Sequence, residues 1–480
     1  MTESIVLARR IFSLDDQLEF ARFSGDRNPM HVDRVLARRT QAGAPVVHGI
    51  HLLLWAIDSF AAANPDRPSM RSLRVQFSNL VYVDEFAEVV QTQISPDAIR
   101  MNVCVNRVPM SQITVTFGAP QLEAIDYSSF SPERIPSLQT ALDLDFEQMS
   151  SRAGRIAFLP LPTDVDAMFP AASQWLGNRR VAALAASTYL VGMVCPGLHS
   201  IFGELAVEAC AETGHEDALA FCVTRTDPRF RLVLQKIAGG GLTGTVKSFA
   251  RTPPVQQPAA NSLSHLVTPA EFAGSVVLVV GGSRGLGELT AKLLAAGGAQ
   301  VIITWQSGKD DAEKVCAEIR SAGGKCETMS YDASKPVEGQ LSGLLDAPTH
   351  MYYYATPLIF RHQSDLFVRE RLDQFLDIYV DGFWQLSRAL CTRQPKLSVF
   401  YPSSVFVEER PRGMLEYAMA KSAAEVLCTE MNKALPPMHI TVSRLPRLPT
   451  DQTAGISAAK TALPLEILLP VVREVQSWPR

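Results

Sequence analysis

Three glycines between an apolar run and a helix-like segment constrain the fold of this chain most. Val277–Val280 is followed by Gly281, Gly285 and Gly287, in a G-x-x-x-G-x-G pattern. Glycine adopts positive φ and lets the backbone approach a pyrophosphate closely, and a helix that begins there offers free N–H groups to phosphate. Glycine also collects in ordinary loops, but its position between strand and helix favours a dinucleotide site. The alternating strand-like and helix-like segments that follow predict a parallel sheet covered by helices.

A segment rich in proline, glutamine and serine divides the chain. Residues 251–270 read RTPPVQQPAANSLSHLVTPA, show no periodicity and are typical of a linker. A single hydrophobic core seldom exceeds about 250–300 residues. The chain of 480 residues is therefore expected to form two or three domains. We place the linker at 253–272 and the α/β domain at 273–480.

Before the linker, an apolar helix-like stretch at Val46–Ala63 precedes several strand-like runs. A similar series recurs downstream, where Cys195–Ile201 opens another helix-like stretch that echoes Ala44–Ile50, and further strand-like runs follow. An order of long helix and then antiparallel strands suggests an α+β fold in which a sheet wraps one helix. We therefore expect two copies of one fold. The resulting division is 1–120 and 155–252 for the two copies, with a connector at 121–154.

The composition excludes several classes of protein. A formal net charge of -4 gives no reason to expect binding to nucleic acid or to an anionic membrane. No apolar stretch reaches the roughly 20 residues that a membrane-spanning helix needs, and Met1–Phe12 lacks the layout of a secretory signal. The eight cysteines are scattered, without the spacing of metal ligands. We expect a cytoplasmic protein with reduced thiols and no bound metal.

A second group of residues in the α/β domain has the spacing of an acid–base site. Tyr417 and Lys421 lie four positions apart and can share one helix face, and Ser404 precedes Tyr417 by thirteen residues. An adjacent ammonium favours the phenolate, so we expect Lys421 to lower the pKa of Tyr417 from its usual value of about 10. Tyr417 would then serve as a general acid and base, while Ser404 would donate a hydrogen bond to a substrate carbonyl.

Together with the glycine turn, these residues resemble the short-chain dehydrogenase/reductase family over 274–477. The resemblance implies a Rossmann-type domain with a doubly wound parallel sheet, and it implies that Ser404, Tyr417 and Lys421 are catalytic. It also implies a set of cofactor-binding residues, which are Gly281, Ser283, Arg284, Gly285, Leu286, Gly287, Asp332, Tyr417 and Lys421.

The residues after the second strand favour NADP(H) over NAD(H). Thr304–Gln306 occupy the place of the carboxylate that would bind the ribose of NAD, and Arg284 lies inside the glycine turn. In the absence of that carboxylate, the Arg284 guanidinium could bind the 2′-phosphate of NADP(H). Alternatively, Arg284 is a solvated loop charge.

The domain departs from the family at four places, which are Val280, Tyr353–Thr356, Tyr379 and Pro446–Arg447. Val280 stands where the family has a threonine, and Tyr353–Thr356 replaces an Asn-Asn-Ala-Gly segment. Arg447 replaces a glycine after Pro446. Tyr379 occupies the position of the catalytic asparagine. The loss of this asparagine removes one group of the family's water-linked proton relay. It is compatible with a slow or specialised reductase.

A dense polar string precedes the apolar helix of the N-terminal half. Asp26 and His31 are five residues apart, with Asn28 and Pro29 imposing a turn between them. A carboxylate and an imidazole on one turn can grip a water molecule and move its proton. Gly49 begins the apolar helix, where a backbone N–H can stabilise an enolate oxygen. Taken alone, the string is equally compatible with a polar turn in which Asp26 caps a local helix.

The string matches Ser-Gly-Asp-x-Asn-Pro-x-His-x-Asp without a gap, over Ser24–Asp33. It resembles the signature of MaoC-like (R)-specific enoyl-thioester hydratases/dehydratases of the hot-dog fold. The resemblance implies that Asp26 and His31 activate the water that is added to an enoyl thioester or removed from a 3-hydroxyacyl thioester. It also implies that the Gly49 amide is the oxyanion donor, while Asn28 orients the turn.

The second copy keeps only part of this pattern. Asn178 or Gly177 falls where Asp26 would lie, no residue corresponds to His31, and His199 matches His48. We therefore expect a double hot-dog in which the first half is catalytic. The second half would complete the sheet and the acyl tunnel.

The two implied activities act on adjacent chemical states. The sequence predicts a bifunctional enzyme that reduces a 3-oxoacyl thioester with NADPH and interconverts 3-hydroxyacyl and 2-enoyl thioesters. Its substrate would be an acyl-CoA or an acyl-carrier-protein thioester, and we expect a homo-oligomer without nucleic-acid or membrane partners. Two alternatives remain. In the first, only one half of the chain is active, and the intact motif favours the hydratase. In the second, the chain is a non-catalytic assembly subunit.

Overall fold

The computed structural model divides the chain into two compact units, the first comprising Met1–Pro253 and the second beginning at Pro254. The expectation of several domains is confirmed. Residues 121–126 of the expected connector lie outside the described part of the chain. The structure describes residues 4–40, 42–120, 127–211, 217–359, 367–394, 396–451 and 462–478.

The first unit begins with a series of helices and strands that we call the first series. Its central element is α4, a helix whose sequence GIHLLLWAIDSFAAA is apolar almost all round and is therefore buried along most of its length. The elements of the first series are β1 (Ile5–Ile11), α1 (Leu14–Ser24), α2 (Pro29–Val32), α3 (Arg34–Ala37), α4 (Gly49–Ala63), β2 (Met70–Phe77), β3 (Phe86–Ile94), β4 (Ala98–Val105) and β5 (Val108–Phe117).

A second series follows a short connecting region that contains η1 (Tyr127–Ser129), β6 (Arg134–Ile135) and α5 (Phe146–Met149). Its long buried helix is α8, which continues into the π-helical turn η2. We expected this helix to open at Cys195, with His199 matching His48, and this expectation is wrong because strand β8 begins at Ser200. The elements of the second series are β7 (Ala153–Ala157), α6 (Pro162–Met168), α7 (Pro170–Leu176), α8 (Asn178–Tyr189), η2 (Leu190–Val194), β8 (Ser200–Ala209), β9 (Ala218–Asp227), β10 (Leu232–Gly239) and β11 (Leu242–Ala250).

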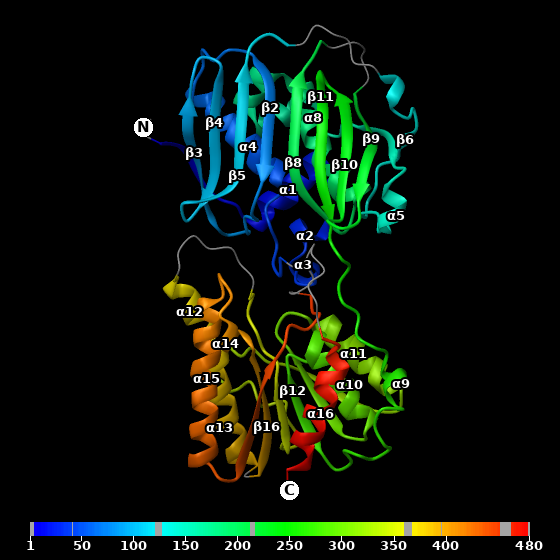
Figure 1. Cartoon of the computed structure of the whole chain (residues 1–480), viewed down its shortest axis with the longest axis vertical. Helices are drawn as coiled ribbons and strands as arrows, with labels where there is room; N and C mark the ends of the chain where they lie inside the picture. The colour runs from blue at the N-terminus through cyan, green and yellow to red at the C-terminus, as the bar shows by residue number, and fades with distance from the viewer. Residues whose placement is uncertain are drawn as a thin grey trace. The chain divides into compact units, whose positions relative to one another are not determined.

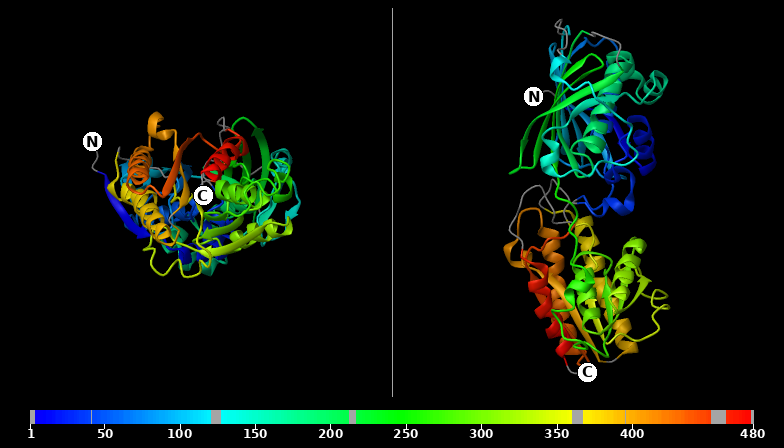
Figure 2. Two further views of the ribbon diagram at one scale, coloured as in Figure 1. Left: turned by 90° about the horizontal axis from the view of Figure 1, so that it is seen from below. Right: turned by 90° about the vertical axis from the view of Figure 1, so that its right-hand side faces the viewer.

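The strands of both series form one sheet, which has eleven strands within the described residues. The order is β1-β3-β4-β5-β2 in the first series and β8-β11-β10-β9-β7 in the second, so the second repeats the first in mirror order along the sheet. The two series join where β2 pairs with β8 in antiparallel register, from Ser72↔Glu208 to Gln76↔Glu204. Helices α4 and α8 lie on one face of this sheet and contact each other (Figures 1 and 2).

The second unit is built on a parallel sheet with the order β14-β13-β12-β15-β16-β17, six strands in the part of the chain that is described. The order reverses between β12 and β15, which is where doubly wound sheets bind their ligands. Val277 and Val279 of β12 face one hydrophobic cluster, while Leu278 and Val280 face another, so both faces of the sheet are covered. The predicted α/β architecture is confirmed.

The helices of the second unit divide between these two faces. Helices α10, α11 and α16 pack on the first face, and α13 and α15 pack on the second (Figure 1). None of the helices that the structure describes is long and apolar enough to cross a membrane. The elements are α9 (Ala260–Leu263), β12 (Val276–Val280), α10 (Gly285–Ala296), β13 (Gln300–Trp305), α11 (Lys309–Ser321), β14 (Lys325–Ser330), β15 (His350–Tyr353), α12 (Arg369–Leu376), η3 (Asp377–Gly382), α13 (Phe383–Arg393), β16 (Leu397–Ser404), α14 (Phe406–Glu409), α15 (Leu415–Ala434), β17 (Met438–Leu445) and α16 (Pro464–Ser477).

Candidate active sites

The turn between α1 and α2 buries the polar string of the first series. Helix α1 ends at Gly25, whose φ of 82° is the left-handed conformation that glycine adopts without strain. Asn28 caps α2, because its Oδ1 accepts a hydrogen bond from the N–H of Met30 at 3.1 Å. Asp26 is 1% exposed and His31 8% exposed, and each offers a polar atom within 4.8 Å of the other. The turn therefore brings the predicted carboxylate and imidazole together.

The hydrogen bonding of His31 determines which ring nitrogen is free. Its Nδ1 lies 2.8 Å from the carbonyl oxygen of Val46, and since a carbonyl only accepts, Nδ1 carries the hydrogen. In the neutral ring, Nε2 then keeps its lone pair and can accept a proton. Burial lowers the pKa of His31, although the nearby Asp26 carboxylate acts in the opposite direction. The imidazole is therefore poised as a base.

The Asp26 carboxylate is held by one donor from each series. Thr188 Oγ1 of α8 donates to Oδ2 at 2.7 Å, and the N–H of Asn28 donates to Oδ1 at 3.1 Å. Burial raises the pKa of Asp26, while His31, Thr188 and Asn28 oppose that rise because they favour the charged form. We did not predict Thr188 from the sequence. The available signal was a pair of hydroxyl residues, Ser187 and Thr188, after the apolar run Val181–Ala186 of the helix.

His48 supports the site from the first residue before α4. Its ring stacks on that of His31 with 3.9 Å between centroids, and its Nε2–H donates to the carbonyl oxygen of Asp26 at 3.0 Å. Val46 and Val47 pair with the chain at Tyr82 and Val81, so the helix begins at Gly49, three residues later than predicted. The N–H of Gly49 thus lies in the first turn of α4 and is free of an intrahelical acceptor.

Asp26, His31 and His48 also form a cluster with the composition of a metal site, and it is the one such group in the described ranges. The donor set does not fit a metal, however. Nδ1 of His31 is bonded to Val46, and the two ring nitrogens of His48 face the Asp26 carbonyl and Oε1 of Gln17. Only the carboxylate and one imidazole nitrogen remain as ligands.

A pocket opens on these groups and is lined by residues of both series. It encloses about 550 Å³, part of which is open to solvent. Its polar end contains Asp26, His31, Thr188 and Gly49, and most of its remaining wall is apolar. The apolar wall consists mainly of Met30, Val46, Val47, Leu52, Phe77, Leu80, Val81, Val191, Ile201 and Phe202. Such a pocket can hold an acyl chain with its reactive end at the polar groups.

The glycine turn of the second unit has the backbone conformation that the pattern predicts. Gly281 and Gly285 have φ values of 79° and 59°, and a side chain at Gly287 would meet the Gly281 carbonyl oxygen at 2.3 Å. Helix α10 begins at Gly285 without a side-chain cap on its N–H groups. A side chain at Gly285 would face open space. The free N–H groups and the open space fit a pyrophosphate.

The other expected cofactor residues lie at the same end of the sheet. Ser283 and Leu286 belong to the glycine turn and the first turn of α10, and Asp332 follows β14. Asp332 Oδ1 accepts from Ser334 Oγ at 2.6 Å. Burial acts to raise the pKa of Asp332, but the bonds from Ser334 prevail and lower it. Arg284 is not a solvated loop charge, since its side chain is 24% exposed and pairs with Asp451 at 3.2 Å.

Ser404 and Tyr417 meet where β16 ends and α15 begins. Both are nearly buried, and the Ser404 side chain is hydrogen-bonded to the Tyr417 hydroxyl. Burial raises the pKa of Tyr417 to about 12, and the Ser404 bond only partly offsets this. We predicted a lowered pKa, and this prediction is wrong because the burial of the phenol outweighs its hydrogen bond.

The Lys421 ammonium lies among aromatic rings and bonds to one backbone carbonyl. Its Nζ donates to the carbonyl oxygen of Pro402 at 2.7 Å and lies 3.9 Å and 4.8 Å from the ring centroids of Tyr379 and Tyr401. The Tyr417 ring centroid is 6.0 Å away. Burial lowers the pKa of Lys421 to about 7. The ammonium is thus stabilised by two ring faces and one carbonyl.

The residues that depart from the family pattern are hydrogen-bonded, and one of them, Tyr379, lies beside this lysine. The Tyr379 hydroxyl lies 2.6 Å from Thr356 Oγ1, and Tyr379 belongs to the π-helical turn η3. Tyr353 donates to the carbonyl oxygen of Ile378 at 2.7 Å, and the Tyr354 hydroxyl lies 2.8 Å from Thr290 Oγ1. These bonds give each buried phenol a partner and lock the segment that replaces Asn-Asn-Ala-Gly.

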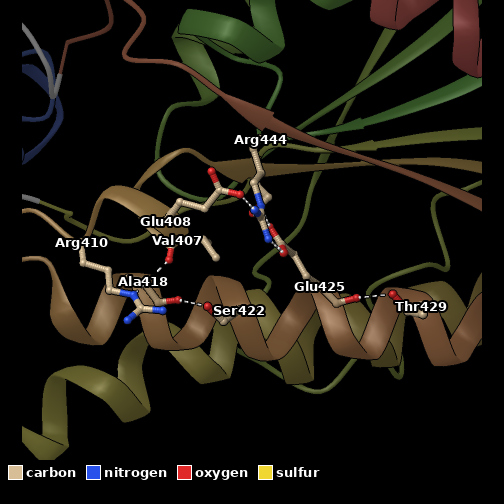
Figure 3. Close-up of polar contacts among 9 residues, drawn as sticks. Val407, Glu408, Arg410, Ala418, Ser422, Glu425, Thr429 and Arg444 are labelled. Carbon is tan, nitrogen blue, oxygen red and sulfur yellow. Dashed lines mark hydrogen bonds and ion pairs between the residues drawn. The ribbon is translucent and has the colours of Figure 1, made fainter.

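A charged network supports the same helix one turn further on (Figure 3). Glu425 accepts from Arg444 Nε at 2.8 Å and from Nη2 at 2.6 Å, and Arg444 also pairs with Glu408. Ser403 Oγ donates to the same Glu425 carboxylate. The network therefore ties α15, β16, β17 and α14 together beside Ser404 and Lys421.

Two family models match the chain. One, described as MaoC like domain, matches residues 5–108, and the other, described as short chain dehydrogenase, matches residues 275–345. An uncharacterized oxidoreductase of Methylorubrum extorquens is 35% identical over 83 residues, which are 17% of this chain and 33% of that protein. The chain thus matches about a third of the length of that relative.

Other similar proteins are named as reductases. A 3-oxoacyl-[acyl-carrier-protein] reductase of Aggregatibacter actinomycetemcomitans is 25% identical over 169 residues, 33% of this chain and 70% of that protein. An NADP-bound 3-oxoacyl (acyl-carrier-protein) reductase of Agrobacterium tumefaciens is 17% identical, with a TM-score of 0.39 over 42% of this chain and 87% of that chain. The two predicted resemblances are confirmed by the family matches: the polypeptide combines a MaoC-like domain with a short-chain dehydrogenase domain.

Proposed function

We propose that the first unit hydrates a 2-enoyl thioester to an (R)-3-hydroxyacyl thioester and catalyses the reverse dehydration. The observation that carries this proposal is the buried pair of Asp26 and His31 at the polar end of an apolar pocket. We further propose that each series is one hot-dog fold and that the first unit is a double hot-dog. The repeated strand order around α4 and α8 supports this assignment.

The geometry suggests a division of roles among the polar groups. Asp26 and Nε2 of His31 would hold one water molecule, whose oxygen bonds to C3 of the enoyl group. The proton released from the water would pass through these two groups to C2, so that both return to their starting state. The Gly49 N–H would donate to the thioester oxygen as negative charge develops there. The apolar wall would hold the acyl chain.

We also propose that the second unit binds NADP(H) and reduces a 3-oxoacyl thioester. The positive-φ glycines and the uncapped start of α10 fit the pyrophosphate. The cofactor would be held by Gly281, Ser283, Arg284, Gly285, Leu286, Gly287, Asp332, Tyr417 and Lys421. When bound, it would supply a hydride to the substrate carbonyl carbon.

The chain's own residues would complete this reduction. Ser404 would hydrogen-bond the substrate carbonyl, and the Tyr417 hydroxyl would give its proton to the carbonyl oxygen. The raised pKa of Tyr417 suits a proton donor in the direction of reduction. Arg284 would exchange Asp451 for the 2′-phosphate, because the two anions compete for one guanidinium. The names of the reductases to which this chain is similar support the substrate class.

Together, the two units would act in sequence on one acyl group, carried by coenzyme A or by an acyl-carrier protein. Reduction yields a 3-hydroxyacyl thioester, which is the compound that dehydration consumes. We also propose that the protein acts in the cytoplasm as a homo-oligomer.

A second candidate function keeps only the hydratase active. One observation favours it, namely that Lys421 donates to Pro402 and that burial raises the pKa of Tyr417. The second unit would then bind the nucleotide with little turnover.

An assay of 2-enoyl and 3-oxoacyl thioesters, on CoA and on an acyl-carrier protein, tests these proposals. Hydration is followed by loss of enoyl absorbance and reduction by oxidation of NADPH or NADH. We expect Asp26→Asn to abolish hydration alone and Tyr417→Phe to abolish reduction alone. Hydration without any NADPH oxidation would select the second candidate. Absence of both activities from the wild type would overturn the proposal.

A further inference from the structure

Thr188 places a hydroxyl from the second series on the catalytic carboxylate of the first. Its Oγ1 donates to Asp26 Oδ2 at 2.7 Å across 162 positions of sequence. Thr188 is 4% exposed and Asp26 is 1% exposed, so no bulk water competes for this bond. Thr188 also lines the pocket beside Asp26. The contact is therefore part of the site and not of its surroundings.

The neighbouring residue shows that this hydroxyl is used differently from an ordinary helical one. Serine and threonine inside helices usually bond back to a carbonyl three or four residues earlier. Ser187 does so, because its Oγ donates to the Leu184 carbonyl at 2.6 Å. Thr188, one position later, donates to Asp26 instead. The hydroxyls of these two adjacent residues of α8 therefore have different acceptors, and substitutions at the two positions can be compared directly.

Gly192 makes a second contribution from the turn that follows α8. A side chain there would lie 2.3 Å from Asp26 Oδ1 and 2.5 Å from Oδ2, which is closer than any real contact. The φ of Gly192 is not positive. Glycine is therefore required here only because a side chain would collide with Asp26. Its carbonyl oxygen accepts from Asn28 Nδ2 at 2.9 Å. The absence of a side chain lets η2 approach both Asp26 and Asn28.

We propose that the second series completes the catalytic centre: Thr188 is a positioning residue that orients Asp26 and favours its ionised form, and Gly192 provides the room. This inference rests on the proposed hydratase function. A hydroxyl that donates to a carboxylate binds the charged form more strongly than the protonated one. In hydration the carboxylate must accept a proton from water, so the bond maintains the form that reacts.

The other groups facing Asp26 do not replace this bond. His31 lies within 4.8 Å but keeps its own bond to Val46. His48 bonds to the backbone oxygen of Asp26, not to its carboxylate. The Asp26 charge contributes to raising the pKa of Tyr189, but the Tyr189 hydroxyl accepts from the N–H of Leu138 at 2.7 Å. Thr188 therefore supplies the one side-chain hydrogen bond to this carboxylate that the described contacts contain.

The test compares Thr188→Val, which keeps the shape of the side chain, with Thr188→Ser, which keeps the hydroxyl. The measurement is kcat/KM for enoyl-thioester hydration against pH, whose acid limb belongs to the Asp26–His31 pair. We expect Thr188→Val to shift the acid limb to a pH about one unit higher. At pH values below the limb, kcat/KM of the variant should be about tenfold lower than that of the wild type. Thr188→Ser should keep the wild-type profile, and Ser187→Ala is the matched control.

Two outcomes would overturn the inference. One is a Thr188→Val profile that coincides with that of the wild type. The other is an equal loss in Thr188→Val and Thr188→Ser at every pH, which is the result of a packing role. Titration of the Asp26 carboxyl by ¹³C NMR in the same proteins without substrate separates this inference from the proposed function. A wild type that hydrates no enoyl thioester refutes the function, whereas an unchanged titration of Asp26 in Thr188→Val refutes the role of Thr188.

Discussion

Asn28 Nδ2 donates to the carbonyl oxygen of Gly192 at 2.9 Å and thereby fastens the Asp26–His31 turn of the first series to the second. The same amide nitrogen also lies 3.3 Å and 3.2 Å from the carbonyl oxygens of Gly197 and Leu198. Asn28 is 1% exposed, so these carbonyls have no water to replace it. The geometry of the Asp26–His31 turn therefore depends on backbone that follows it by more than 160 residues.

Asn28→Ala should destabilise the first unit and misplace its catalytic pair. Loss of the amide leaves buried carbonyls without their donor, which costs about 1–3 kcal/mol in the free energy of unfolding. We expect hydration to fall by at least tenfold, since Asp26 and His31 flank the freed residue. Denaturant unfolding and the hydration assay measure the two effects.

Asn178→Ala is the matched control, because Asn178 is an asparagine of the second series that begins a helix, α8, and does not contact the Asp26–His31 turn in the described bonds. Its Nδ2 bonds to the Pro162 carbonyl at 3.3 Å at an exposed position, and its Oδ1 accepts from Ser173 Oγ at 2.5 Å. It should cost less stability and leave hydration unchanged. Equal effects of the two substitutions would contradict the anchoring role of Asn28.

Local patterns in the sequence were sufficient to predict the parts of both sites that lie close together in the chain. Gly281, Gly285 and Gly287 act within one turn, and Asp26 and His31 are joined by a single short loop. The spacing of these residues in the sequence therefore determines their relative positions in space. The alternation of strand-like and helix-like segments also predicted the parallel sheet correctly, because each crossover helix covers a face of the sheet.

Groups brought together by long-range packing could not be predicted in this way. Thr188 and Gly192 reach Asp26 only because β2 pairs with β8 and brings α8 beside α4. The direction of Lys421 depends on Pro402, Tyr379 and Tyr401, which come from different segments. The four-residue spacing of Tyr417 and Lys421 predicted a shared helix face but not which atom the ammonium would meet.

His51 should make the stability of the first unit sensitive to mild acid. It lies inside α4, stacks on Phe20 with 4.4 Å between centroids, and is 3% exposed. Burial, followed by the charge of Arg10, lowers its pKa to about 3. The unfolded chain, with a histidine pKa of about 6.5, binds the proton first. Stability is therefore lost as pH falls below 6.5.

His51→Gln should reduce this acid sensitivity while keeping an acceptor for Gln17. The wild-type free energy of unfolding should fall by about 1.4 kcal/mol more than that of the variant between pH 7.5 and 5.5. Urea unfolding of the first unit at the two pH values gives the difference. Parallel losses in the two proteins would show that His51 is not the titrating group.

Glu425 should matter more to reduction than to overall stability. Its carboxylate pairs with Arg444 (Figure 3) and accepts from Ser403, which precedes Ser404, the residue that we propose to be catalytic. Glu425 lies one helical turn after Lys421. Glu425→Gln keeps the shape but removes the charge. We expect a roughly tenfold loss of NADPH-dependent reduction, with a stability cost of about 1 kcal/mol because Arg444 is partly exposed.

Glu430→Gln on the same helix is the control, since Glu430 pairs with Lys433 where both side chains are more than half exposed. It should leave reduction and stability unchanged. Enoyl hydration should be unaffected in both variants. If the two substitutions reduce NADPH oxidation equally, the network around Arg444 has no special role in positioning the reductase site.

Lys421→Met should abolish reduction and stabilise the second unit at neutral pH. Burial lowers the pKa of Lys421 to about 7, while the unfolded chain has a lysine pKa of about 10.4. Between these values the unfolded chain binds the extra proton, so wild-type stability rises with pH. The free energy of unfolding of the wild type relative to the variant should therefore increase between pH 7 and pH 9, by up to about 2 kcal/mol. The buried cysteines make the free energy of unfolding fall as pH rises, which is the opposite direction. They are present in both proteins, so their contribution cancels when the two are compared. A constant difference across this range would mean that the Tyr379 and Tyr401 rings and the Pro402 carbonyl keep Lys421 charged.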